Sequence, residues 1–320
     1  MAKKKSPGSG KKLIKSVIAA AAVFAVCVLC LVGVCIEKGV FNEELLDKKV
    51  SLPDITPSNV EPDDNFDFGV YYFDVGQGDS ELIVSGDTSV LIDAGEAEYG
   101  KTVVKNIKAL GIEKLDYIIA THPHADHIGG LAEVIESFEV GKIIAPRVSD
   151  ELTPTTAVYE DMLDAVKAKG MKLTAARAGN TYSLDGAELE ILAPLSDDYD
   201  NLNDFSVVCR VTKGDISFLF TGDASKASEA DMTASGEELY ADVLKVGHHG
   251  SKTASTNAFL EAVTPSVCVI SCGKGNDYGH PTREALSRLE KHTDNIYRTD
   301  LNGNIAIFTE GEKLYIKTDT

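Results

Sequence analysis

Thr121-His122-Pro123-His124-Ala125-Asp126-His127 is the stretch of this chain that decides its fold. It places three imidazoles and one carboxylate within six residues, directly after the apolar run Tyr117–Ala120. Such a run predicts a buried strand, and Ile128–Phe138 predicts a helix. The polar side chains therefore lie on a loop at the carboxyl end of a strand, where α/β sheets hold their functional sites.

This motif has the composition of a metal site. Imidazole nitrogens and carboxylate oxygens are ligands of zinc and neighbouring transition metals. His122 and His124 can hold one ion from an extended segment, while Asp126 and His127 project differently and can hold a second ion, as in two-metal hydrolases. The alternative is a polar loop with unrelated histidines. The whole chain has only 7 histidines, so three within one hexapeptide favour the metal site.

Three further motifs accompany H-x-H-x-D-H, namely Phe73–Ser80 (FDVGQGDS), Gly247–Ser251 (GHHGS) and Tyr278–Pro281 (YGHP). Together the four resemble the metallo-β-lactamase fold of metal-dependent hydrolases and, within it, the hydrolase domain of the ComEC competence proteins and their stand-alone relatives. The resemblance covers residues 68–320. It implies a four-layer αββα sandwich, with two mixed sheets face to face, helices outside and the site along one edge. Periodicity alone predicts only a single α/β domain.

The resemblance also implies a ligand set. Asp223 follows a predicted strand and a glycine, and in the family this position bridges the two metals; a structural aspartate that caps the next helix is the alternative. The expected ligands of two divalent zinc or manganese ions are His122, His124, Asp126, His127, Asp223 and His248. The mechanism implied is two-metal hydrolysis, in which the ions activate a water and neutralise charge on the developing oxyanion.

Other residues are expected around the ions. Asp93 is expected to order the metal-binding loop by hydrogen bonds, and Asp79 lies on a glycine-rich turn that is either near the metals or a plain hairpin turn. The residues expected to take part in catalysis are Asp126, His249 as a proton donor or a partner of the ligands, and His280 as a contact of the substrate or leaving group. Contacts with an anionic substrate are expected from Ser251, Lys252 and Asn203.

The chain departs from the family at one place. The family has a third histidine ligand for the first metal shortly before the bridging aspartate, but no histidine stands between His127 and His248. Asn203, Asp204 or Ser206 occupies that region. Oxygen ligands are harder than imidazole, so we expect a weaker and more open first site that accepts manganese.

The N-terminus predicts a membrane anchor. Residues 1–15 carry six lysines and no acid, and Ser16–Ile36 has no charge over 21 residues, which is long enough to span a bilayer. Lysines before the span predict that the N-terminus stays in the cytoplasm and the rest is exported. A cleaved signal peptide is the alternative. The expected order is a basic tail (1–15), a transmembrane helix (16–36), an extracytoplasmic stalk (37–67) and the hydrolase domain (68–320), in a single-pass protein of the cell membrane.

The predicted exported part is acidic. Residues 37–320 hold 25 basic and 50 acidic side chains, a net charge of −25. Such a surface repels phosphate backbones at long range, which argues against tight non-specific DNA binding but leaves room for a local basic groove. Its three cysteines are predicted to be core residues, because Cys268 and Cys272 would lie about 13 Å apart in an extended chain, beyond disulfide reach.

Three functions fit these features. The first is a membrane-anchored phosphodiesterase or nuclease with a phosphodiester substrate such as DNA, favoured by the resemblance and by the donors Ser251, Lys252 and His280. The second is another ester hydrolase on the same fold, such as a phosphocholine esterase, lactonase or β-lactamase. The third is a binding module without turnover, against which the intact ligand set argues.

Overall fold

The computed structural model describes residues 54–57 and 66–320. The predicted basic tail, transmembrane segment and most of the stalk lie outside the described residues. Within the described part, no helix is long and apolar enough to cross a membrane.

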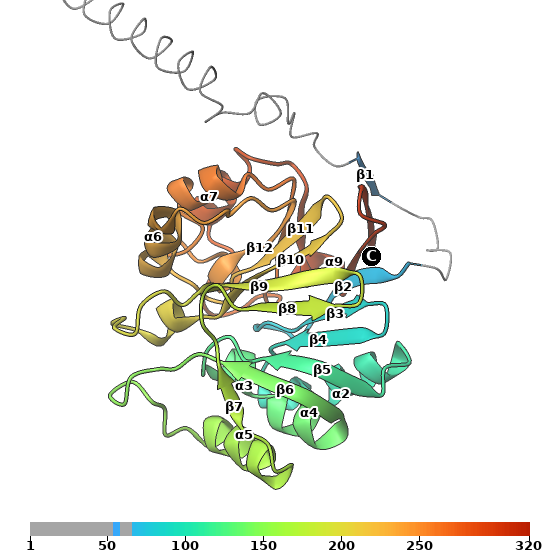
Figure 1. The fold of residues 1–320 in the computed structure, drawn as a ribbon. Helices are drawn as coiled ribbons and strands as arrows, with labels where there is room; N and C mark the ends of the chain where they lie inside the picture. The colour runs from blue at the N-terminus through green and yellow to red at the C-terminus, as the bar shows by residue number, and fades with distance from the viewer. Residues whose placement is uncertain (1–53, 58–65) are drawn as a thin grey trace, which may run out of the picture. The chain divides into compact units, whose positions relative to one another are not determined.

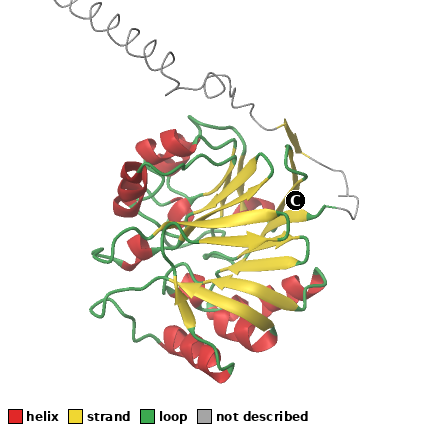
Figure 2. Ribbon diagram, viewed as in Figure 1, coloured by secondary structure: helices red, strands yellow, loops and turns green. Residues whose placement is uncertain are grey.

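Two sheets form the middle of the domain (Figures 1 and 2). The strand order is β1-β16-β15-β2-β3-β4-β5-β6-β7 in the first sheet and β14-β13-β12-β11-β10-β9-β8 in the second. The strands of the first sheet are β1 (Asp54–Pro57), β2 (Phe68–Tyr72), β3 (Glu81–Ser85), β4 (Thr88–Ile92), β5 (Lys114–Ile119), β6 (Glu139–Ala145), β7 (Leu173–Ala175), β15 (Ile305–Thr309) and β16 (Lys313–Thr318). Those of the second are β8 (Thr181–Leu184), β9 (Ala187–Ala193), β10 (Val208–Lys213), β11 (Ile216–Phe220), β12 (Val243–Lys245), β13 (Val267–Ile270) and β14 (Ile296–Arg298).

Helices cover the outer face of each sheet. Buried side chains of α2, α4 and α5 pack against the first sheet, and those of α6, α7 and α8 pack against the second. The α-helices are α2 (Gly100–Ala109), α3 (Ala125–Ile128), α4 (Leu131–Ser137), α5 (Ala157–Ala168), α6 (Lys226–Ser235), α7 (Asn257–Val263), α8 (Arg283–Leu289) and α9 (Thr299–Asn302). Short 3-10 helices are η2 (Ala97–Tyr99), η3 (Leu202–Phe205) and η4 (Gly247–Gly250).

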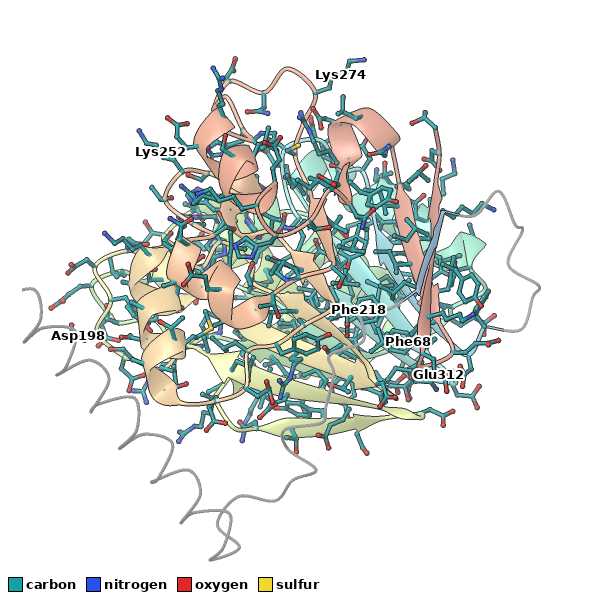
Figure 3. All side chains as sticks on the ribbon, turned by 90° about the horizontal axis from the view of Figure 1, so that it is seen from above. Phe68, Asp198, Phe218, Lys252, Lys274 and Glu312 are labelled. Carbon is teal, nitrogen blue, oxygen red and sulfur yellow. The ribbon has the colours of Figure 1, made fainter. Side chains whose placement is uncertain are left out.

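Apolar side chains on both faces of the central strands explain the layering. In β11, Phe218 and Phe220 point into the core between the sheets, while Leu219 packs under the outer helices. Phe218 meets Phe68 of β2 across that core with ring centroids 5.4 Å apart (Figure 3). Strands that are buried on both faces need a layer on each side. The predicted four-layer α/β sandwich is therefore confirmed for the described domain.

Parallel strands set the position of the functional loops. β4 to β7 run parallel in the first sheet, and β11 to β14 run parallel in the second. The loop after β5 carries the His122–His127 motif, and the loop after β11 carries Asp223. Parallel strands of one sheet end at the same edge, so their loops can meet there.

The helix predicted over Ile128–Phe138 begins later, as α4 at Leu131, and the short helix α3 (Ala125–Ile128) precedes it across Gly129-Gly130. A Cβ atom at Gly130 would collide with the carbonyl oxygen of Ala94, and one at Gly129 would collide with the backbone of Ala97. The metal-binding loop therefore packs directly on the backbone that follows β4, and an unbroken helix would prevent this approach.

The segment predicted as a stalk contributes to the sheet. β1 pairs in parallel with β16, from Asp54↔Lys313 to Pro57↔Ile316. The domain thus begins earlier than the predicted residue 68, because an edge strand of four residues carries too short a pattern to be recognised from sequence. The cysteine prediction is confirmed, since Cys209, Cys268 and Cys272 are buried and free.

Candidate metal centre

Two groups of potential ligands lie on either side of Asp223. The first consists of His122, His124 and Asp223, and the second of Asp126, His127 and His249. In the first group, His122 Nε2 lies 2.9 Å from His124 Nδ1. In the second, His249 Nε2 lies 3.3 Å from Asp126 Oδ2.

Asp223 faces both groups with different oxygens. Its Oδ2 lies 3.9 Å from His122 Nε2. Its Oδ1 lies 3.2 Å from His127 Nε2 and 3.5 Å from His249 Nε2. This is the arrangement expected of a carboxylate that bridges two ions. A further grouping of Asp79, His127 and Asp223 uses a carboxylate that is already paired with Lys245.

The chemistry of these atoms fits a bound metal. His127 Nε2, His249 Nε2 and Asp223 Oδ1 are buried and have no hydrogen-bond partner. Buried polar atoms are normally hydrogen-bonded. Three unpartnered atoms that face one another are therefore explained if a cation binds between them. Imidazole and carboxylate together suit zinc, manganese or iron. Among the described residues, no third imidazole joins the first group, as the missing histidine in the sequence predicts.

Asp93 organises the loop that carries the histidines. It is fully buried. Its Oδ1 accepts the Thr121 backbone N–H at 2.8 Å, and its Oδ2 lies 2.7 Å from His127 Nδ1. This contact occupies Nδ1 and turns Nε2 towards Asp223, which is the usual way in which proteins fix a ligating histidine. Asp93 makes the kind of contact that the resemblance implies for it.

The GHHGS loop places His249, which was not among the predicted ligands, in one of the ligand groups, while the ligand role of His248 stays a prediction. Both residues have left-handed backbone conformations, with φ 50° and 52°. The two rings consequently point in different directions: His249 is buried beside Asp126, whereas His248 is partly exposed, with its Nε2 3.6 Å from Asp223 Oδ2. Left-handed non-glycine residues are strained and are retained where function requires them.

The pKa values differ between the two groups. Burial lowers the pKa values of His122 and His124, so both imidazoles are neutral and ready to bind metal. Burial opposes charge on His249 as well, but Asp223 and Asp79 outweigh it and raise its pKa to about 10. The pKa of His127 is likewise raised, by Asp223 and Asp93 against the effect of burial. A cation in the second group must therefore displace protons.

A buried lysine, Lys245, forms an ion pair beside the second ligand group. Lys245 Nζ lies 2.7 Å from Asp79 Oδ2 and 3.9 Å from Glu81 Oε1, and all three side chains are buried. Burial opposes ionisation of Asp79, but Lys245 and His249 lower its pKa to about 2, whereas burial and Asp79 raise that of Glu81. The ion pair is thus Lys245–Asp79, and Asp79 Oδ1 lies 3.1 Å from His249 Nδ1.

The remaining predicted residues divide into two sets. His280, Asn203 and Lys252 line cavities at the metal centre. Ser251 lines neither of these two cavities: it is buried and its hydroxyl is bonded to that of Thr253, so its substrate contact stays a prediction.

Asp204 was one candidate for the place of the missing histidine, and it points elsewhere. Its carboxylate accepts the backbone N–H groups of Ser225 and Ser228 and the side-chain amide of Asn201. It therefore caps α6. Asn203 Nδ2 lies 3.3 Å from His248 Nδ1, and Ser206 Oγ lies 3.4 Å from His122 Nδ1.

Two supporting residues were missed from the sequence. Lys245 stands in an otherwise apolar strand, which is a signal for a buried charge with a partner. Thr121 precedes the motif, and its hydroxyl bonds Asp93 Oδ2, a contact for which the sequence carries no signal.

Comparisons with known proteins agree with this geometry. Residues 73–274 match the family described as the Metallo-beta-lactamase superfamily. The chain belongs to this superfamily. ComE operon protein 3 of Bacillus subtilis (strain 168) is 31% identical over 252 residues, covering 72% of this chain and 32% of the relative. Competence protein ComA of Neisseria gonorrhoeae is 32% identical over 255 residues, covering 78% of this chain and 33% of the relative.

The chain thus spans about a third of the length of these curated relatives. Among solved structures, CmlA, a diiron beta-hydroxylase from Streptomyces venezuelae, matches with a TM-score of 0.52 at 15% identity, covering 77% of this chain and 55% of that chain. At this identity the likeness shows the fold alone. The superfamily, the relatives and the ligand groups together identify a metal-binding hydrolase related to competence proteins.

His249→Ala should lower transition-metal affinity by more than about 100-fold, which exceeds the effect of losing a residue that only hydrogen-bonds a ligand. His248→Ala should change the affinity by less than about tenfold. Both variants are compared by metal titration and elemental analysis. Loss of metal only in His248→Ala would return the ligand role to His248.

Lys245→Met should lower the free energy of unfolding by about 3–5 kcal/mol, because it leaves buried carboxylates without a cation. Lys114→Met is the matched control. Lys114 pairs with Asp116 and its side chain is 51% exposed, so that change should cost much less, because exposed ion pairs contribute little. Urea denaturation measures both, and equal losses would contradict a buried ion pair at Lys245.

Proposed function

We propose that this protein is a dinuclear metal-dependent phosphodiesterase that acts on nucleic acid. The observation that carries the proposal is the position of Asp223 between two ligand groups that open into one cavity. This cavity has a volume of about 320 Å³, and its lining includes Gln77, Asn203, Tyr278 and His280 beside the ligands.

Metal ions in such a site activate a water and neutralise charge that develops on the phosphate oxygens. Side chains of the chain itself would hold the substrate and contact the leaving group. Asn203 presents an amide N–H at the cavity wall, next to His248. Burial and the neighbouring His248 lower the pKa of His280, so its imidazole is neutral. A neutral imidazole can donate or accept a hydrogen bond at the leaving group.

Two features favour a nucleic-acid substrate over other esters. The relatives with whole-domain similarity are competence proteins. In addition, Tyr278 is 68% exposed at the cavity, and its ring stacks on His280 with centroids 5.9 Å apart. An exposed aromatic ring beside a phosphate site offers a surface on which a base can stack.

The two metal positions should differ in affinity. The first group offers two imidazoles and one shared carboxylate, while the second offers a carboxylate of its own in Asp126 as well as two imidazoles. The first ion is therefore held less tightly, and activity should follow its binding. Neither group has a third imidazole, so both positions should discriminate less against manganese than a site of three histidines does.

We expect the full chain to hydrolyse bis-p-nitrophenyl phosphate and single-stranded DNA, with manganese at least as effective as zinc. A cephalosporin and a lactone serve as competing substrates. Asp126→Ala should remove both activity and bound metal because it deletes the carboxylate that only the second group contains. Hydrolysis of the cephalosporin or lactone alone would replace the phosphodiesterase proposal.

We also propose that residues 16–36 anchor the chain in the cell membrane, with the metal centre outside the cytoplasm. The uncharged run and the lysines before it support this orientation. Alkaline phosphatase fused after Thr320 should be active, since it requires export. A fusion that is inactive although the protein is intact would reverse the topology, and release of the protein into the medium would show cleavage.

A further inference from the structure

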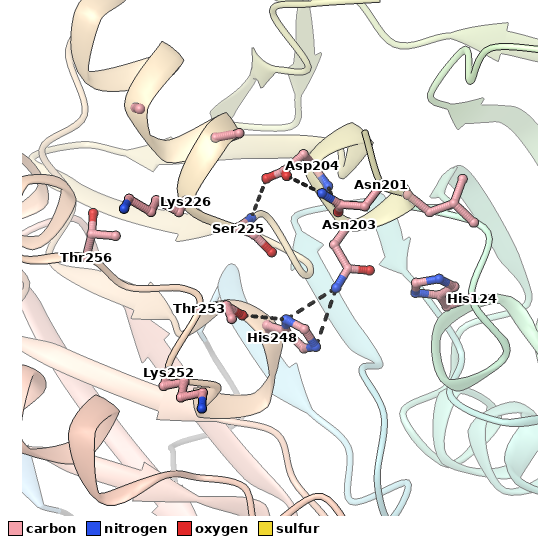
Figure 4. A pocket seen from close by; sticks show the side chains of 13 residues that line it. His124, Asn201, Asn203, Asp204, Ser225, Lys226, His248, Lys252, Thr253 and Thr256 are labelled. Carbon is pink, nitrogen blue, oxygen red and sulfur yellow. Dashed lines mark hydrogen bonds between the residues drawn. The ribbon is translucent and has the colours of Figure 1, made fainter. Parts of the chain in front are cut away.

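A second cavity adjoins the metal centre (Figure 4). Its volume is about 980 Å³, and it shares His124, Asn203 and His248 with the smaller cavity at the ligand groups. The two cavities are therefore neighbours with three side chains between them, and the larger one lies within reach of a substrate that extends from the ligand groups.

The larger cavity combines an apolar wall with two cations. Leu202, Ala227 and Ala230 contribute apolar surface. Lys226 and Lys252 lie on the side of the cavity away from His124 (Figure 4). The backbone N–H of Lys226 donates to the carbonyl of Thr253 at 3.1 Å, which ties the start of α6 to the loop that carries Lys252.

Neither lysine is neutralised within the described residues, where no ion pair of Lys226 or Lys252 occurs. The one carboxylate among the lining residues, Asp204, is already bonded to two backbone N–H groups of α6 and to Asn201. The cavity thus presents two free ammonium groups in a chain whose net charge is −19. Cations grouped in a concave site attract and hold an anion locally.

We propose that this cavity binds the phosphate next to the scissile one in a single strand of nucleic acid, with Lys226 and Lys252 as its contacts. The sugar and base of the intervening nucleotide lie against the apolar wall. The inference rests on the proposed phosphodiesterase function and extends it: a substrate needs a second phosphate to use the cavity. The protein should therefore prefer an oligonucleotide over an isolated phosphodiester.

The test compares substrates that differ by one phosphate. The full chain is assayed with manganese on the dinucleotide TpT, the trinucleotide TpTpT and bis-p-nitrophenyl phosphate. Wild type should have the lowest KM for TpTpT. Lys226→Ala should raise that KM by at least about tenfold, the effect of losing a charge-assisted hydrogen bond, and should leave the two single-phosphate substrates within about twofold.

Lys172→Ala is the matched control. Lys172 is exposed and immediately precedes β7, at the edge of the sheet opposite the carboxyl ends that carry the site. Its loss removes the same charge from the same acidic chain but should leave all three KM values unchanged. A similar loss in the control would show a general charge effect and overturn the proposal.

Binding measured without turnover separates the two proposals. Calorimetry in EDTA should show tighter binding of TpTpT than TpT by wild type, and Lys226→Ala should reduce the difference by at least about tenfold. For a longer single strand, the slope of log affinity against log salt should be smaller in magnitude by up to about 0.7 in this variant, since the cavity contacts one phosphate.

If wild type hydrolyses no phosphodiester but still shows this binding difference, the enzymatic proposal fails and the subsite stands. If TpT and TpTpT bind equally, or if Lys226→Ala weakens both to the same extent, the subsite is overturned whatever the activity.

Discussion

Asp223 is a buried carboxylate with one oxygen that no hydrogen-bond donor reaches, and the site is organised around this unbalanced charge. Burying a charge is costly unless it is paired. Two other buried acids near it have partners: Asp93 bonds Thr121, and Asp79 pairs with Lys245 through one oxygen. Beside Asp223 Oδ1 lie further unpartnered atoms, the Nε2 atoms of His127 and His249. A bound cation would neutralise the buried charge of Asp223. Metal binding should therefore stabilise the folded state as well as supply the chemistry of the site.

Strained backbone conformations hold the side chains around Asp223 in place. Asp93, His248 and His249 all have positive φ values, and each places its side chain at the centre. These conformations cost free energy and persist only where the surroundings determine them. The surroundings are the ends of parallel strands in two packed sheets, together with a glycine contact that brings the metal loop onto the backbone after β4. The large apolar core between the sheets therefore fixes loops that would be unfavourable alone.

The sequence was informative where a role follows from local spacing. The His122–His127 motif after an apolar run indicates both the strand end and the ligands, and Asp223 is recognisable in the same way. It was uninformative where a role depends on backbone direction or on distant partners. Adjacent histidines in a left-handed turn point apart, so His249 could not be distinguished from His248. The capping role of Asp204 depends on α6, more than twenty residues away.

The acidic surface and the cationic cavity have complementary consequences. Long-range repulsion by a net negative chain slows encounters with polyanions and suppresses non-specific adhesion. Recognition then depends on short-range contacts, which here are concentrated in two adjoining cavities. One holds the ligand groups around Asp223, and the other holds Lys226 and Lys252. In the proposed function, a single phosphate would engage only the first cavity, whereas consecutive phosphates on a flexible strand would engage both. Selection by the spacing between charges would then operate in a protein whose overall charge opposes the proposed substrate.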